Sequence, residues 1–145
     1  MAERFLEQLR RAERDFAHYL EGHCARLDLA PADGRMLAYL EARGPCPIGE
    51  LQAIFGFKPS TLTTVVDRLA DHRLVSRKPN PADRRSVLVV LTGTGRALAE
   101  RVQGLLDVVD GQVLRATTEA DRAGFARVLG AIAEATDHAS VSQPG

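Results

Sequence analysis

Apolar residues recur at helical spacing between Pro59 and His72, in the middle of the chain. They stand at positions i, i+3, i+4 and i+7 and therefore share one side of a helix: these residues are Leu62, Val65, Val66 and Leu69. The residues on the opposite side are polar, namely Ser60, Thr64, Asp67 and Asp71. The pattern predicts an amphipathic helix whose outward surface begins with short hydroxyl side chains, so nothing bulky blocks a close approach there.

A second short helix is predicted immediately before it, from Pro47 to Phe55. Its apolar residues, which are available for a core, are Ile48, Leu51, Ile54 and Phe55. The segment 56–58 then joins the two helices with a glycine at its start. Two short amphipathic helices joined by a tight turn of this kind are typical of a helix-turn-helix motif.

A β-hairpin is predicted directly after this motif. The segments 74–78 and 86–91 are rich in β-branched and apolar residues, whereas 79–85 is rich in turn formers. A helix-turn-helix followed by a hairpin with a basic tip is a winged helix, which we expect at about residues 31–95.

Longer helices are predicted on both sides of the winged helix. The first, at about residues 2–27, carries a coiled-coil-like seam with steps of four and three: Phe5, Leu9, Ala12, Phe16, Tyr19 and His23. The seam indicates packing against a partner chain, with burial against the last helices of the same chain as the alternative. A helix over 31–43 follows, and its inward-facing residues are expected to be Met36, Leu37 and Leu40.

The C-terminal part of the chain predicts two further helices. Thr92 is expected to cap a long helix that reaches about residue 116, with one apolar side formed by Leu98, Val102, Leu105, Val109 and Val113. Within it, Gly104 and Gly111 are expected to allow close helix approach or bending between the DNA-binding part and the dimerisation part, or they are simply tolerated. Thr118 and Asp121 have the spacing of a capping box and open a last helix to about residue 136, whose inward-facing residues are expected to be Phe125, Val128, Leu129 and Ile132. The tail over 138–145 is small and polar, and we expect it to be mobile.

The fold class is therefore mainly α with a small β-hairpin wing. With 145 residues, the chain is long enough for one domain with a core and too short for two ordinary domains. No apolar run is long enough to span a bilayer, and the charged start of the chain lacks the apolar region of a signal peptide. We expect a cytoplasmic protein without a membrane partner.

Charge is distributed unevenly along the chain, although the net charge is zero. Residues 58–85 hold seven Lys or Arg against three Asp, so this segment carries 7 − 3 = +4 and the rest carries −4. A basic patch on a neutral protein is the electrostatic signature expected of a modest DNA binder. It gains weight because it coincides with the winged helix.

No catalytic or metal-binding constellation is evident in the sequence. The four histidines are scattered, no His/Cys pair has metal-site spacing, and the segment 92–95 lacks the lysine of a phosphate-binding loop. We therefore expect neither an enzyme nor a bound cofactor or metal.

A series of short motifs runs through the winged-helix segment: Glu50-Leu51, Ser60-Thr61-Leu62-Thr63, Val66-Asp67-Arg68-Leu69, Leu74-Val75-Ser76-Arg77, Asp83-Arg84-Arg85 and Leu91-Thr92 with Gly95. Together they resemble the MarR family of winged helix-turn-helix transcription regulators. The resemblance implies a homodimer built from both ends of the chain, at about residues 2–27 and 96–136, that binds a pseudo-palindromic operator in double-stranded DNA. It also implies a repressor that a small aromatic or phenolic molecule releases from DNA.

The geometry of a helix-turn-helix assigns roles to the helix over 59–72, the recognition helix. Such a helix enters the major groove by its N-terminal end, where the residues nearest to the base edges are Ser60, Thr61 and Thr64. Thr63 and Arg68 are expected at phosphates or at the groove wall. Many relatives have an arginine at the position of Thr64, so we expect sequence discrimination to depend more on DNA shape and on the wing.

Further DNA-binding candidates flank the recognition helix. Lys58, a poor residue for a helix N-cap, is either a phosphate contact or a neutral surface lysine, and Arg77 adds a positive charge in the first strand of the wing. The resemblance implies that an arginine at the wing tip enters the minor groove while an Asp–Arg pair braces the loop. Arg84 is the better candidate for insertion and Asp83 with Arg85 for the brace, although the two arginines could exchange roles.

Arg73 is a second departure from the family pattern. Relatives usually place a glycine there, because the recognition helix ends in a left-handed conformation that strains other residues. We therefore expect a differently shaped helix end as one possibility.

Effector and dimer residues follow from the resemblance and from the helix patterns. Candidates for an effector site between the dimer helices and the winged helix are Tyr19, His23, Arg26, Arg35 and Tyr39. Candidates for the dimer interface are Phe5, Leu9, Phe16, Val113, Phe125, Val128, Leu129 and Ile132.

Two alternatives remain open at this point. Cys24 could make the protein a peroxide-responsive thiol sensor, whereas Cys46, between two prolines, is interpreted as structural or incidental. The winged helix could also serve only for protein contact, which the zero net charge and the outward Asp67 and Asp71 would favour.

Overall fold

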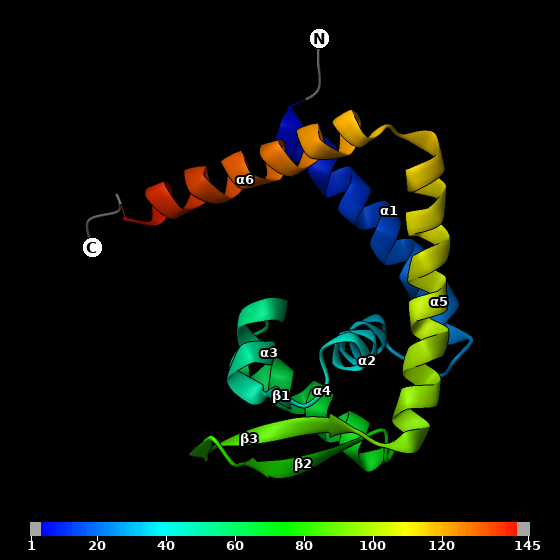
Figure 1. Cartoon of the computed structure of the whole chain (residues 1–145), viewed down its shortest axis with the longest axis vertical. Coiled ribbons are helices and arrows are strands. Elements are labelled where there is room, and N and C mark those ends of the chain that lie inside the picture. The colour runs from blue at the N-terminus through cyan, green and yellow to red at the C-terminus, as the bar shows by residue number, and fades with distance from the viewer. Residues whose placement is uncertain (1–3, 142–145) are drawn as a thin grey trace. The chain divides into compact units, whose positions relative to one another are not determined.

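The computed structural model describes residues 4–141, with side chains as far as residue 137. Its helices are α1 (Phe5–Ala25), α2 (Pro31–Arg43), α3 (Ile48–Phe55), α4 (Pro59–Asp71), α5 (Gly93–Ala116) and α6 (Glu119–Val141), and its strands are β1 (Cys46–Pro47), β2 (Val75–Asn80) and β3 (Asp83–Leu91) (Figure 1). The chain forms two compact units that divide within α5, between Leu106 and Asp107. Within residues 4–141, no helix combines the length and the apolar character that crossing a membrane requires.

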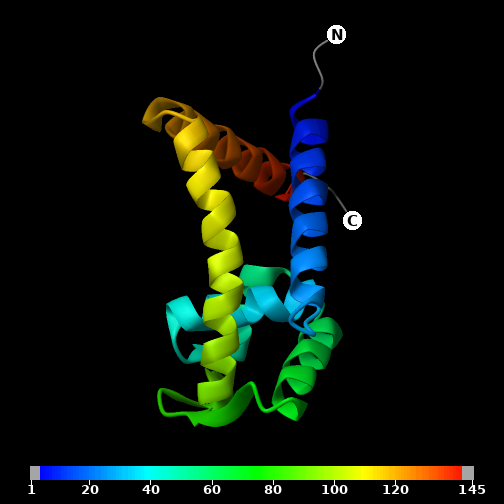
Figure 2. The same ribbon diagram turned by 90° about the vertical axis from the view of Figure 1, so that its right-hand side faces the viewer.

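In the first unit, α4 lies beside the β2–β3 hairpin in both views of the molecule (Figures 1 and 2). The core is one cluster of buried side chains to which every helix and strand of this unit contributes. The predicted inward faces of α2 and α4 are confirmed, since none of their seven apolar residues is more than 3% exposed: Met36, Leu37, Leu40, Leu62, Val65, Val66 and Leu69. In α3, Leu51 is fully buried, but Ile54 is 56% exposed, so its predicted place in the core is wrong.

The sheet has one strand more than the predicted hairpin. Residues Cys46–Pro47 form β1 and pair with Val89 and Leu88 of β3, which gives the antiparallel order β1-β3-β2. Pro47 therefore belongs to a strand rather than to the helix that follows it. The β2–β3 hairpin is also longer than predicted, because only Pro81 and Ala82 lie between the strands. The basic tip consequently extends on paired strands instead of on a loose loop.

Close approach between α5 and the end of the recognition helix depends on one glycine. Gly95 is buried in the first turn of α5, and a Cβ atom there would overlap the carbonyl oxygen of Leu74. By contrast, a Cβ atom at Gly104 would meet nothing within 4 Å. The predicted close approach at Gly104 is therefore absent within this chain, and the position is open.

The second unit consists of the end of α5 and of α6. The predicted capping box is confirmed, because the Asp121 carboxylate accepts a hydrogen bond from the Thr118 N–H at 2.8 Å and the Asp121 N–H donates to the Thr118 hydroxyl at 3.1 Å. The backbone of α6 continues to Val141, five residues past the expected end. The last part of the predicted mobile tail, 142–145, lies outside the described residues.

The apolar face of α6 does not face inward within a single chain. Phe125 is 60% exposed and Val128 40%, Leu129 is exposed to a similar degree, and Ile132 is partly buried. The prediction that these side chains face inward does not hold within a single chain, and their predicted place in the dimer interface stays a prediction. Two helices without other secondary structure bury too little surface to cover such a face.

Candidate nucleic-acid interface

The recognition helix α4 begins as the sequence predicts. Lys58 is its N-cap with extended backbone (φ −61°, ψ 148°) and makes no side-chain capping bond, and Pro59 occupies the first turn, where its missing N–H costs nothing. The Lys58 side chain is exposed. It therefore remains available at the end of the helix that a helix-turn-helix directs toward DNA.

Four hydroxyl-bearing residues cover the first two turns of α4, and all of them are exposed: Ser60, Thr61, Thr63 and Thr64. Two of the hydroxyls are already engaged by the helix itself. Thr63 donates to the carbonyl oxygen of Pro59 at 3.0 Å, and Thr64 donates to that of Ser60 at 2.9 Å. This part of α4 thus presents a smooth surface of small polar groups.

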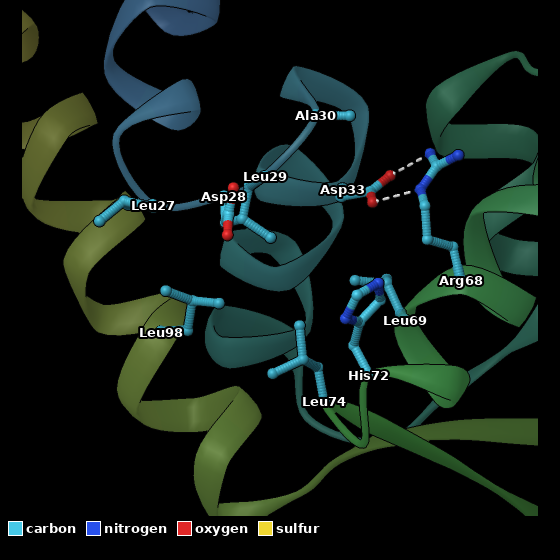
Figure 3. Close-up of a pocket in the computed structure, with 10 residues that line it drawn as sticks. All are labelled: Leu27, Asp28, Leu29, Ala30, Asp33, Arg68, Leu69, His72, Leu74 and Leu98. Carbon is cyan, nitrogen blue, oxygen red and sulfur yellow. Dashed lines mark hydrogen bonds and ion pairs between the residues drawn. The ribbon is translucent and has the colours of Figure 1, made fainter.

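Arg68 has a structural partner that the sequence analysis did not predict. Its Nε and Nη2 atoms donate to the two carboxylate oxygens of Asp33 in α2 at 2.6 and 2.5 Å (Figure 3). The Asp33 side chain is 4% exposed and that of Arg68 is 41% exposed. The carboxylate raises the pKa of the Arg68 guanidinium. Arg68 therefore fixes α4 on α2, and its predicted contact with phosphates or the groove wall stays a prediction.

The same pair forms part of the wall of a cavity of about 350 Å³. Figure 3 shows the cavity between the α1–α2 connection, the C-terminal end of α4 and the start of α5. Its apolar lining consists of Leu27, Leu29, Leu69, Leu74 and Leu98. The ion pair thus closes one side of a largely hydrocarbon-lined space behind the recognition helix.

Arg77 of β2 forms an ion pair with Asp67 of α4. Both side chains are more than one-third exposed, so water screens the attraction and its contribution to stability is small. The pair nevertheless compensates the carboxylate on the outward face of α4. Asp67 is one of the two outward carboxylates that favoured a winged helix used only for protein contact, so its pairing with Arg77 weakens that alternative.

The wing tip is held by hydrogen bonds to its own backbone. The Asn80 side-chain oxygen accepts from the Ala82 N–H, and Asp83 Oδ1 accepts from the Arg85 N–H, each at 3.0 Å. Asp83 and Arg85 are therefore joined through the backbone amide of Arg85, and the predicted brace by an Asp–Arg pair stays a prediction. Both guanidinium-bearing side chains of the tip, Arg84 and Arg85, are exposed.

The C-terminal end of α4 keeps the left-handed conformation that usually favours glycine. Arg73 has φ 58°, the Leu74 N–H donates to the Leu69 carbonyl at 2.9 Å, and the helix closes without glycine. The expectation of a differently shaped helix end is wrong. Thr92 supports this turn, because its hydroxyl lies 2.7 Å from the Arg73 carbonyl oxygen and accepts from the Gly95 N–H at 3.0 Å.

The structure does not bring the five predicted effector residues together. Arg35 and Tyr39 line a pocket of about 370 Å³ whose other walls include Phe16, Ile54, Phe55 and Leu106. His23 and Arg26 line a different pocket of about 240 Å³. Tyr19 packs against the His23 ring at 4.4 Å and donates to the Leu105 carbonyl at 2.9 Å, so it is an internal contact.

The Arg35–Tyr39 pocket has the more defined lining. The Arg35 guanidinium lies 5.5 Å from the centre of the Phe55 ring, and the Tyr39 ring meets the same ring edge-on at 5.7 Å. The Tyr39 hydroxyl donates to Glu50, which also accepts two bonds from Arg43 at 2.9 Å. The hydrogen bonds from Arg43 hold the pKa of Glu50 below its ordinary value. Sequence reasoning missed Phe16 and Phe55 as pocket residues, since their spacing indicated only a helix seam and a core position.

Both cysteines are buried thiols, and burial raises their pKa values, that of Cys46 to about 11. A reactive thiol needs access and a lowered pKa. Cys24 has neither, which counts against the thiol-sensing alternative. Among the described residues, no three His, Cys, Asp or Glu side chains are grouped so as to hold a metal ion.

The helix α4 exposes a face of hydroxyl side chains, the short helix α3 precedes it, and the β2–β3 hairpin with its basic tip follows it. This arrangement defines a winged helix-turn-helix protein. The chain matches the MarR family model over residues 29–87. It is 28% identical over 102 residues to the uncharacterised HTH-type transcriptional regulator YwhA of Bacillus subtilis, covering 70% of this chain and 73% of that one. It is 32% identical over 87 residues to the multiple antibiotic resistance protein MarR of Escherichia coli, covering 60% of each.

Solved structures agree with this assignment. Bordetella bronchiseptica BpsR has a TM-score of 0.73 and 26% identity, and the superposition covers 90% of this chain and 94% of that one. Staphylococcus aureus MepR in its DNA-binding conformation has a TM-score of 0.86 over 92% of this chain and 99% of that one. At 15% identity, MepR shows the shared fold alone.

Proposed function

We propose that the chain is a homodimeric DNA-binding transcription regulator, in which α4 enters the major groove and the β2–β3 wing tip reaches the minor groove. The observation that carries this proposal is the exposure of the hydroxyl face of α4 together with Arg84 and Arg85, on a segment of charge +4. Lys58 at the N-terminus of α4 adds a cation where a phosphate would approach. The description of YwhA as an HTH-type transcriptional regulator and the regulated DNA binding of BpsR support the same function.

Exposed apolar side chains support the homodimer. They occur on α1 and on both helices of the second unit, and those among the predicted interface residues are Phe5, Phe16, Val113, Phe125, Val128 and Leu129. Apolar surface of this kind on a charged chain marks an interaction site. In a two-fold symmetric dimer, the two α4 helices would meet half-sites roughly 34 Å apart, one turn of DNA.

The Arg35–Tyr39 pocket is our candidate for the effector site. Its volume of about 370 Å³ suits a small molecule, its aromatic walls suit a flat ring, and Arg35 supplies a cation for an acidic group. DNA binding by BpsR is regulated by 6-hydroxynicotinic acid, an aromatic acid, which supports an effector of this class. Binding would lower DNA affinity if it favoured a conformation whose recognition helices no longer match the groove.

A fluorescence anisotropy titration with a duplex that carries the region upstream of the protein's own coding sequence tests DNA binding. Affinity should fall steeply with salt, because contacts to phosphates release counterions. Arg84→Ala should weaken binding by about tenfold, whereas Arg14→Ala, an exposed arginine of α1, should not. Equal binding by wild type and Arg84→Ala would contradict the wing assignment.

Light scattering and a ligand titration test the remaining parts. Leu129→Glu should convert the dimer into a monomer and weaken operator binding together with it. Hydroxylated aromatic acids should displace the wild type from DNA and leave Arg35→Ala on DNA. A monomeric wild type at micromolar concentration would refute the two-chain arrangement.

A further inference from the structure

The Thr64 hydroxyl has only one proton, and the helix already holds it. Thr64 Oγ1 lies 2.9 Å from the Ser60 carbonyl oxygen, to which it donates. A threonine hydroxyl offers one donor and two acceptor lone pairs. To any partner outside the helix, Thr64 therefore presents lone pairs and a methyl group.

Thr64 also lies where a base can reach it. It is exposed on the side of α4 opposite the buried stripe that includes Leu62 and Leu69, within the first two turns of the helix. The N-terminal part of a recognition helix is the part that contacts base edges. The groups offered by Thr64 would then meet the floor of the major groove.

Two arginines, Arg68 of α4 and Arg77 of the neighbouring strand β2, are engaged by carboxylates. Arg68, one turn further on, donates with Nε and Nη2 to Asp33, and Arg77 pairs with Asp67. Guanine presents only acceptors in the major groove and is usually read by a donor fork such as arginine. The guanidinium forks of Arg68 and Arg77 are therefore already engaged by carboxylates of the same chain.

We propose that Thr64 determines sequence specificity by selecting an A·T base pair as an acceptor-only reader. The proposal rests on the DNA-binding function proposed above. Adenine offers its N6 amino group as a donor in the major groove, and thymine of the same pair offers its C5 methyl group. A single A·T pair thus satisfies the Thr64 lone pair and the Thr64 methyl group together, whereas cytosine supplies a donor without a methyl group and guanine supplies neither.

Selection of binding sites from a random pool of DNA duplexes locates the base pair that faces residue 64. The full-length wild type and Thr64→Arg each select sites from the same pool. Because arginine reads guanine with two hydrogen bonds, the half-site position that switches to guanine in the Thr64→Arg pool marks the pair that faces residue 64. We expect an A·T pair at this position in the wild-type pool.

Two base analogues at this base pair then distinguish the contact of Thr64 with the thymine methyl group from its contact with the adenine amino group. The affinity for each duplex is measured by anisotropy titration. Deoxyuridine in place of thymidine removes only the methyl group, and purine deoxyriboside in place of deoxyadenosine removes only the N6 amino group. Wild type should lose about two- to tenfold in affinity with each analogue. Thr64→Val, which keeps the shape and a methyl group, should respond to deoxyuridine but not to purine deoxyriboside. Thr63→Val carries the same change one residue away and should keep both responses.

The outcomes distinguish this inference from the proposed function. Guanine at the marked position in the wild-type pool, the absence of any switched position in the Thr64→Arg pool, or undiminished amino-group sensitivity in Thr64→Val would each overturn the role of Thr64 while DNA binding stands. Failure of the wild type to retain any duplex would instead refute the DNA-binding function itself.

Discussion

Arg68 in the recognition helix and Asp33 in α2 form a two-bond ion pair, in which the carboxylate is buried and the guanidinium is partly exposed. Because of this difference in exposure, we expect substitutions of Arg68 and of Asp33 to lower the free energy of unfolding by unequal amounts. Arg68→Ala leaves a buried carboxylate without a partner and should lower the free energy of unfolding by about 3–5 kcal/mol. Asp33→Asn leaves a guanidinium that water can still reach, and should cost about 1–3 kcal/mol.

Urea denaturation of the two variants measures this difference. Arg77→Ala, which breaks the exposed pair with Asp67, is the matched control and should change stability by less than about 1 kcal/mol. Equal losses for Arg68→Ala and Arg77→Ala would mean that Asp33 is not buried in solution.

Two glycines of α5 predict opposite responses to alanine. Gly95→Ala places a Cβ atom against the Leu74 carbonyl and should destabilise the chain by about 3 kcal/mol or more, since the backbone there cannot move aside cheaply. Gly104→Ala meets open space and should raise stability by up to about 1 kcal/mol through helix propensity. Thermal unfolding of both variants checks the pair. Loss of the proposed dimer in Gly104→Ala would indicate that a partner helix approaches there.

The left-handed backbone conformation of Arg73 predicts that a glycine at this position stabilises the protein. Its φ of 58° costs a non-glycine residue about 1–2 kcal/mol, and Arg73→Gly removes most of that strain. We expect a gain of about 1 kcal/mol in the free energy of unfolding, measured by urea denaturation. Gly56→Ala, at φ 62° with open space around it, should show the reverse effect.

The burial of Cys24 predicts that its thiol reacts slowly in the folded protein. Its burial and raised pKa should slow alkylation at pH 7–8 by roughly 100-fold in the folded protein relative to the urea-unfolded chain. Peroxide should accordingly leave DNA affinity unchanged in the wild type and in Cys24→Ser. Rapid labelling of Cys24 without denaturant would restore thiol sensing as a function.

The capping box of α6 predicts a response to acid. Hydrogen bonds from Thr118, the backbone N–H first, hold the pKa of Asp121 below its ordinary value of 3.8. Because the folded-state pKa is the lower one, the ionised cap stabilises α6 above pH 3.8, and this contribution is lost as the pH falls through the lowered pKa.

NMR chemical shifts of the first turn of α6 should therefore report loss of helix on acidification below that range. Asp121→Asn should abolish the transition, and Thr118→Ala should weaken the helix start at every pH. Glu119→Gln, in the same turn but outside the capping box, should preserve the transition.

Local patterns in the sequence predicted most of the fold. The buried stripe of α4, the exact bounds of α2 and the caps at Thr92 and Thr118 depend on residues close together in the chain, so spacing and side-chain type suffice. The strand β1 escaped prediction because Cys46 and Pro47 form a strand only by pairing with β3, more than forty residues further on.

The site was predicted less completely than the fold. Exposed positions such as Thr64 and Arg84 follow from the helix face and the hairpin turn. The partner of Arg68 does not, because an aspartate in the first turn of α2 has the sequence signature of an ordinary helix start. The division of the effector candidates between two pockets also depends on three-dimensional packing, since Phe55, which lines the Arg35–Tyr39 pocket alone, comes from a helix whose pattern indicated only core contacts.

The hydroxyl of Thr92 touches the last carbonyl groups after α4 and caps the first turn of α5. One oxygen atom thereby connects the residues that follow the recognition helix α4 and precede β2 with the first turn of α5. A displacement of the first turn of α5 would therefore either break these hydrogen bonds or be passed on to the C-terminal end of α4.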